Sequence, residues 1–141
     1  MTFQQIRGLF ESVTAEALVL GGIPMERICF DGVAETPPDS ATPYAVVSLS
    51  FDQTATETVG CAVEAIKGSL MCNIYTPKNR GSRPGEDIAA EVLRSWVALN
   101  LARQTADRPR VQNIEGPRTL APDARPHHVH ALSCSFTAKA A

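Results

Sequence analysis

The sequence predicts one α+β domain in which two helices pack on one face of a mostly antiparallel sheet. Two stretches repeat apolar residues at helical spacing, and several others alternate apolar and polar residues as strands do. No internal repeat or linker divides the 141 residues, so we expect a single domain over 1–141. The expected order is helix, three strands, helix and two strands, and helices on one face would bury both apolar stripes.

The first helix is predicted over residues 3–19. Thr2 can cap its start, and Gly21–Gly22 is a stop signal that Pro24 reinforces. Its apolar stripe consists of Phe3, Ile6, Leu9, Phe10, Val13, Ala17 and Leu18.

The central strands are predicted next along the chain. Residues 27–30 read as a short edge strand, and the proline-rich stretch 34–43 reads as a loop. Residues 44–51 and 61–75 alternate apolar and polar side chains. We therefore expect them to form a long β-hairpin with one face exposed to solvent. Because the second run is unusually long, we expect a bend or bulge near Gly68.

The second helix is predicted over residues 84–102. Pro84 suits its first turn, and Trp96 lies in its apolar stripe, where a core position is expected. Two strands should follow, over 108–114 and 127–138, separated by a loop over 116–126 that contains three prolines.

The sequence offers little catalytic chemistry. It contains no phosphate-binding glycine loop and no motif of a metalloprotease or serine hydrolase. On a strand, His128 and His130 would share one face and His127 the other, which permits two metal ligands but also fits a polar strand start at the sheet rim. Cys61 and Cys72 lie in strand-like runs, so packing is favoured over a nucleophilic role. We therefore expect a chain that is not an enzyme and has no cofactor or metal.

Charge is distributed unevenly along the chain. Residues 1–75 carry nine acidic and three basic side chains, whereas residues 76–141 carry six acidic and ten basic ones. Opposite halves can attract each other between copies, although folding could also mix the two sets on one surface. The basic residues are too scattered to predict a nucleic-acid patch.

Neither a secretion signal nor a membrane span is expected. The N-terminal residues lack a basic segment followed by an apolar one, and no run of about 18 apolar residues occurs. Synthesis in a cytosol is the corresponding expectation.

Several passages resemble the tail-terminator proteins of long-tailed bacteriophages. They are the amphipathic N-terminal stretch, the proline-rich segment leading into Pro43-Tyr-Ala-Val-Val-Ser-Leu, and the strand Gly68-Ser-Leu-Met-Cys-Asn-Ile-Tyr-Thr-Pro77. A turn with Gly81 and Gly85 then leads into a helix near Asp87-Ile-Ala-Ala-Glu. The resemblance covers most of the chain, and the passage from strand to glycine turn to helix is its most specific part.

The resemblance implies a structural protein of the virion neck, made in the cytoplasm of a bacterial host. Members of that family form hexameric rings that cap the tail tube, stop its growth and present a surface to the head connector, while DNA passes through the centre. The implied partners are other copies, the tail-tube protein, the connector protein and DNA bound without sequence preference, with no membrane. A head–tail connector of the same neck, or a small ligand-binding α+β domain with a pocket at His128, His130 or the cysteines, are the alternatives.

Candidate contact residues follow from the polar stretches that flank the hairpin and the second helix. They lie within 52–60 and 76–85, where subunits or stacked rings are expected to meet. The candidates are Asp52, Thr54, Thr56, Glu57, Lys78, Arg80 and Arg83.

Overall fold

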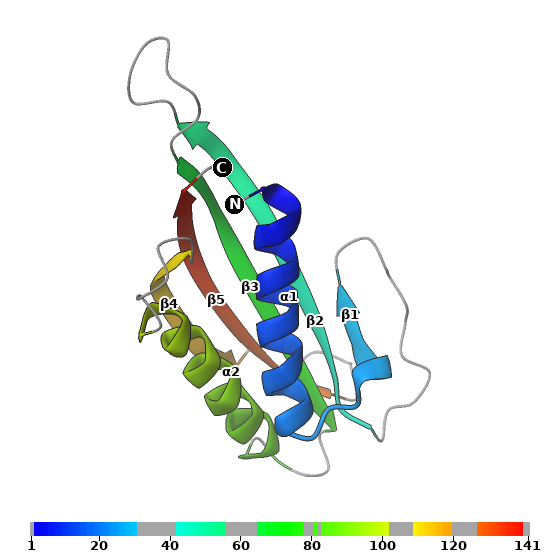
Figure 1. Cartoon of the computed structure of the whole chain (residues 1–141). Helices are drawn as coiled ribbons and strands as arrows, with labels where there is room; N and C mark the ends of the chain where they lie inside the picture. Colours follow the sequence, from blue (N-terminus) through cyan, green and yellow to red (C-terminus); the bar gives the residue numbers. More distant parts are fainter. Residues whose placement is uncertain are drawn as a thin grey trace.

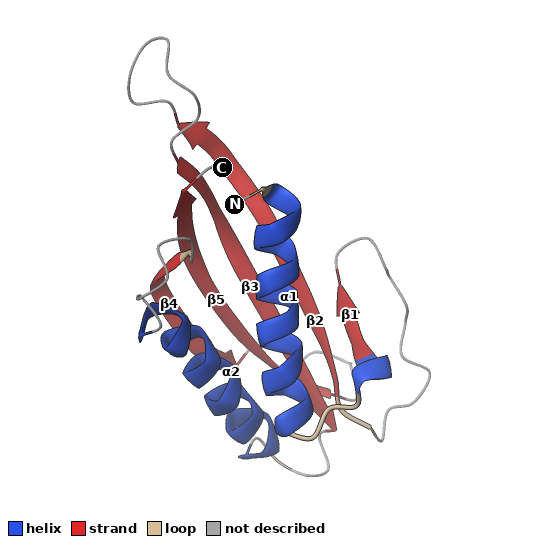
Figure 2. Cartoon of the chain, in the orientation of Figure 1, coloured by secondary structure: helices blue, strands red, loops and turns tan. Residues whose placement is uncertain are grey.

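The computed structural model describes residues 2–30, 42–55, 65–77, 81, 83–101, 109–119 and 127–139. Two helices lie on the same face of a five-stranded sheet whose strand order is β1-β2-β3-β5-β4 (Figures 1 and 2). The predicted α+β class and the element order are confirmed. The elements are α1 (Phe3–Leu20), a 3-10 turn (Met25–Arg27), β1 (Ile28–Phe30), β2 (Tyr44–Ala55), β3 (Ala65–Pro77), α2 (Arg83–Leu101), β4 (Arg110–Thr119) and β5 (His127–Lys139).

Helix α1 begins and ends where the sequence predicts. The Thr2 hydroxyl accepts a hydrogen bond from the Gln5 backbone amide at 3.2 Å, and the Gln5 side chain accepts one from the Thr2 amide at 2.9 Å. This reciprocal cap satisfies donors that the first helical turn leaves unpaired. At the other end Gly22 adopts a φ of 108°, which glycine reaches without steric cost.

The long hairpin forms, but it is an interior part of the sheet. β2 and β3 pair antiparallel from Tyr44↔Tyr75 to Ala55↔Ala65, and β5 pairs with β3 along the whole of β3. The expected bulge lies on the partner strand, between Phe51 and Thr54 of β2 and not on β3 itself. β3 stays regular because its two neighbours hold it, whereas beyond Val47 β2 pairs with a described strand on one side only.

The edge strands differ from the prediction in one respect. β1 is an edge strand as expected, and it pairs parallel with Ala45–Val47 of β2. β4 continues to Thr119, so the first residues of the predicted loop 116–126 belong to a strand. An edge strand tolerates Pro117 because no neighbour needs its missing amide, and the register shifts on both sides of Glu115 accommodate the passage. Residues 120–126 lie outside the described residues.

The core lies between the helices and the sheet. Trp96 is fully buried, as predicted, and its indole Nε1 donates to the hydroxyl of Thr14 in α1 at 3.0 Å. Phe10 of α1 packs against Phe136 of β5 with ring centroids 4.7 Å apart. Each fully buried large apolar side chain contributes about 1.5–3 kcal/mol. The other large core side chains include Ile6, Leu18, Ile23, Leu70, Ile74 and Leu132.

Candidate assembly surfaces

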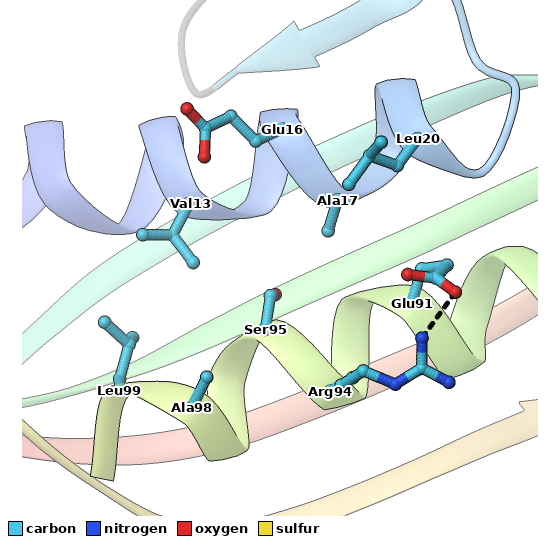
Figure 3. A pocket seen from close by; sticks show the side chains of 9 residues that line it. All are labelled: Val13, Glu16, Ala17, Leu20, Glu91, Arg94, Ser95, Ala98 and Leu99. Carbon is cyan, nitrogen blue, oxygen red and sulfur yellow. Dashed lines mark hydrogen bonds and ion pairs between the residues drawn. The ribbon is translucent and has the colours of Figure 1, made fainter. Parts of the chain in front are cut away.

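A shallow groove separates the outer surfaces of α1 and α2. Figure 3 shows the small side chains of Ala17, Ser95 and Ala98 among the larger residues that line it. The groove has a volume of about 430 Å³, and an ion pair between Glu91 and Arg94 at 2.7 Å lies on its rim. Its lining is mainly apolar and consists of Val13, Glu16, Ala17, Leu20, Glu91, Arg94, Ser95, Ala98 and Leu99. Such a groove suits an apolar side chain.

The side of the sheet formed by β1 and β2 is closed by a cation from α1. β1 covers only three residues of β2, so the rest of that edge lies beside no described strand. Arg7 donates a hydrogen bond to the backbone oxygen of Leu49 at 3.3 Å, and its guanidinium carbon lies 5.7 Å from the centre of the Phe51 ring. Glu11 lies 3.6 Å from the same guanidinium. A charged side chain at this position opposes pairing with another strand.

An amide from α2 closes the opposite edge, at β4. The Asn100 side chain donates to the backbone oxygen of Val111 and accepts from its amide, both at 2.8 Å. These two bonds imitate one step of a strand ladder. β4 is further interrupted at Asn113, where φ is 51°, and at Gly116, where φ is 116°. Bulged edges of this kind resist strand addition, so sister copies are not expected to join by simple extension of the sheet.

The two chain halves with opposite net charge occupy different sides of the sheet. The elements α1, β1, β2 and all but the last two residues of β3 come from residues 1–75 and form one side, while β5, β4 and the overlying α2 come from residues 76–141 and form the other (Figure 1). Among the described residues the first half carries four acidic and three basic side chains, and the second half carries four acidic and five basic ones. The difference in net charge between the two sides of the described sheet is therefore small.

The predicted contact residues fall at opposite ends of the sheet. Asp52 is exposed near the end of β2, and Thr54 pairs with Ile66 two residues later. Arg83 is exposed as the first residue of α2, which begins near the far end of β3 (Figure 1). The structure therefore does not bring these three into one patch. The remaining candidates, Thr56, Glu57, Lys78 and Arg80, lie outside the described residues.

The three histidines alternate across β5, as predicted. His127 is buried against the edges of the Tyr44 and Tyr75 rings, which stack on each other with centroids 4.3 Å apart. His130 is fully buried beside Gly85 in the first turn of α2, and its Nδ1 lies 3.4 Å from the Thr119 hydroxyl. Among the described residues, no three histidine, cysteine or acidic side chains are placed to share a metal ion.

The environment of the His130 ring and of the Cys72 and Cys134 thiols favours the neutral form of each group. Burial lowers the pKa of the His130 ring, nearby His128 acts in the same direction, and Glu86 opposes them. Burial also raises the pKa of the Cys72 and Cys134 thiols to about 12. Cys72 is fully buried in the core, which agrees with the packing role predicted for it. Cys61 lies outside the described residues.

The sequence analysis did not predict which residues bind the backbone groups at the sheet edges. Arg7 and Asn100 look like ordinary polar helix positions, and each acquires its role from a strand carbonyl 42 or 11 residues away in the chain. A polar residue within an otherwise apolar helix end, as at Asn100, is the one available signal. No helix in the described part of the chain is long and apolar enough to span a membrane.

No protein-family model matches the sequence, and no curated protein matches it. Solved structures do match its shape. In one of them, 98% of the other chain and 100% of this chain superpose with a TM-score of 0.72 at 21% sequence identity. A likeness at that identity establishes the fold alone.

Proposed function

We propose that the chain is an assembly subunit of the phage neck, a tail terminator that forms a ring on the end of the tail tube. The supporting observation is that the passages resembling that family form one structural unit. The Gly68–Pro77 passage makes up most of β3, Gly81 follows it, and Gly85 lies in the first turn of α2. β2, which carries the Pro43–Leu49 passage, pairs directly with β3.

Gly85 gives this unit a specific structural requirement. A Cβ atom at this position would overlap the His130 ring, so α2 can approach β5 only because residue 85 has no side chain. The turn between strand and helix is thus tied to a strand that follows it by more than forty residues. The passage from β3 through the glycine turn into α2 is therefore needed for the fold. This supports the proposal, because the same passage is the most specific part of the family resemblance.

The ligand-binding alternative has less support. It requires a pocket at His128, His130 or the cysteines, and the groove between the helices is lined by none of them. His130 and Cys72 are fully buried within the core region. The connector alternative differs from the terminator in the partner it would meet, the head and not the tail, so a binding experiment separates the two.

Electron microscopy of the purified chain mixed with polymerising tail-tube protein tests the proposal. A terminator should add a ring of density at one tube end and shorten the tubes as its concentration rises. Fluorescently labelled chain should bind purified tails and not DNA-filled heads. Binding to heads alone would favour the connector, and indifference to both would contradict a role in the neck.

A further inference from the structure

Strand register places two exposed opposite charges at the same level on the two sides of the sheet. Arg110 of β4 pairs with Thr137 of β5, which pairs with Lys67 of β3. Lys67 lies opposite the irregular stretch of β2 between Phe51 and Thr54, which contains Asp52. Asp52 and Arg110 are both exposed, and beyond Val47 β2 has no described strand on its outer side.

Two lower levels also have charged residues near both sides of the sheet. Glu115 of β4 pairs with Ser133, and the same level continues through Met71 to Ser48 of β2, next to the carbonyl that Arg7 contacts. Arg7 shares its charge with Glu11, so this level is the weakest of the three.

The third level joins Arg118 of β4 to Cys29 of β1. It runs through Ala131, Asn73 and Val46, and the exposed Glu26 lies in the turn just before β1. Going down the sheet, the charges on the β4 side run positive, negative, positive. On the β1–β2 side Asp52 lies at the top level, Arg7 of α1 is ion-paired with Glu11, and Glu26 is followed directly by Arg27. The pair of opposite charges that the register supports most clearly is therefore Asp52 and Arg110.

We propose that a second copy of this chain docks its β4 side against the β1–β2 side of the first, with Arg110 facing Asp52. This inference deepens the proposed function, because it names the surfaces through which a ring would close. The two surfaces differ, so the contact is heterologous, and repeated heterologous contacts form rings when the rotation closes. If neighbouring copies are related by rotation about an axis parallel to the strands, residues at one height along the strands stay at that height in every copy. The opposite charges on the two sides then face each other.

The contact is made by side chains and not by added strands. Arg7 and Asn100 already bind the backbone groups of Leu49 and Val111 at the two edges. Charge pairs at such a boundary set the register of the two copies and discourage other pairings. They also make the association sensitive to salt, because exposed charges are screened within about 10 Å at 0.1 M ionic strength.

Charge exchange tests this arrangement. Asp52→Arg places like charges at the top level, and so does Arg110→Asp. Each variant alone should self-associate about tenfold or more weakly than the wild type in light scattering and sedimentation. An equimolar mixture of the two variants should recover association, because each contact then joins opposite charges. A single chain carrying both changes should recover it as well.

Lys67→Glu is the matched control. Lys67 is exposed at the same level as Asp52 and Arg110, but it lies in the middle of the sheet. Its reversal should leave association within about twofold of the wild type. An effect equal to that of Asp52→Arg would show that net charge, and not the edge contact, controls assembly.

The outcomes separate this inference from the proposed function. Wild-type chain that stays monomeric at its highest soluble concentration, or association that neither single variant weakens, overturns the inference even if the chain binds tail tubes. Recovery by the mixture supports it even if the resulting assembly ignores tail tubes, in which case the terminator proposal fails alone. Circular dichroism of each variant establishes that the comparison is made between folded chains.

Discussion

The two helices cover the same face of the sheet but are held by different means. α1 is held mainly by an apolar stripe, of which Ile6, Phe10 and Leu18 are fully buried. α2 also has a stripe, and in addition it fits the sheet at two points, Gly85 beside His130 and Asn100 on Val111. α1 has one such contact, from Arg7 to Leu49, and the Trp96–Thr14 hydrogen bond joins the two helices. A helix held by an amphipathic stripe can shift between several positions on the sheet, whereas a helix held by such fitted contacts can take only one. The position of α2 is therefore specified more narrowly than that of α1.

The largest effect should come from the residue that joins the two helices. Trp96→Ala should lower the free energy of unfolding by about 3–5 kcal/mol, because it leaves a cavity between α1, α2 and the sheet. Trp96→Phe should cost less, about 1–3 kcal/mol, since the buried Thr14 hydroxyl loses its donor. Urea denaturation followed by circular dichroism measures both. Equal costs for the two changes would contradict the role assigned to the indole nitrogen.

Two helical glycines allow a direct comparison between α1 and α2. Gly85→Ala should lower stability by about 1–3 kcal/mol, because the methyl group meets the buried His130 ring. Gly8→Ala is the control in α1, where nothing other than the backbone of the same helix lies within 4 Å of the added methyl. That change should raise stability by about 1 kcal/mol through helix propensity alone. If both substitutions changed the stability in the same direction, the proposed difference in packing between α1 and α2 would be contradicted.

The amide contact at the end of α2 should contribute less. Asn100→Ala should cost about 1–2 kcal/mol and speed hydrogen exchange at the Val111 amide, which loses its acceptor. Asn100→Asp keeps an acceptor for that amide but turns a carboxylate oxygen toward the Val111 carbonyl, so it should not restore stability. Gln4→Ala, on the exposed surface of α1, is the polar control. Unchanged exchange at Val111 in Asn100→Ala would refute the proposed clamp.

Acid should weaken the α2 contact through His130. The pKa of its ring is lower in the folded chain than the ordinary value of about 6.5, so the fold favours the neutral ring. The unfolded chain binds the proton first as the pH falls. Stability is therefore fully present above about pH 6.5 and decreases below it, until the folded ring also becomes protonated. The effect should be the smallest of the four, because nearby Glu86 partly favours the charged form.

Denaturation midpoints between pH 8 and pH 5 measure this dependence. His130→Leu should flatten the profile over that interval, whereas His128→Gln should leave most of the slope in place. A profile that is flat for the wild type would show that His130 keeps its ordinary pKa.

The sequence by itself determined the secondary structure and the class of fold. Apolar spacing and capping residues placed α1 within one residue of its observed end, and alternation identified which residues of β2, β3 and β5 face the core. These signals are local, since a helix or strand records its buried face in the spacing of its own residues. The same local signals predicted an end of β4 that is too early, at residue 114 and not at Thr119. Pro117 normally ends a strand, and only the strand order shows that it lies at a sheet edge, where its missing amide costs nothing.

Only the tertiary structure decided how the elements meet. The pairing of β5 between β3 and β4 brings Gly85 to His130, Asn100 to Val111 and the level of Arg110 to that of Asp52. None of these relationships has a signature in residue spacing, because each joins groups whose separation along the chain is set by topology. The surfaces proposed for assembly are of this kind: their charges are visible in the sequence, but their matching levels exist only once the strands are in register.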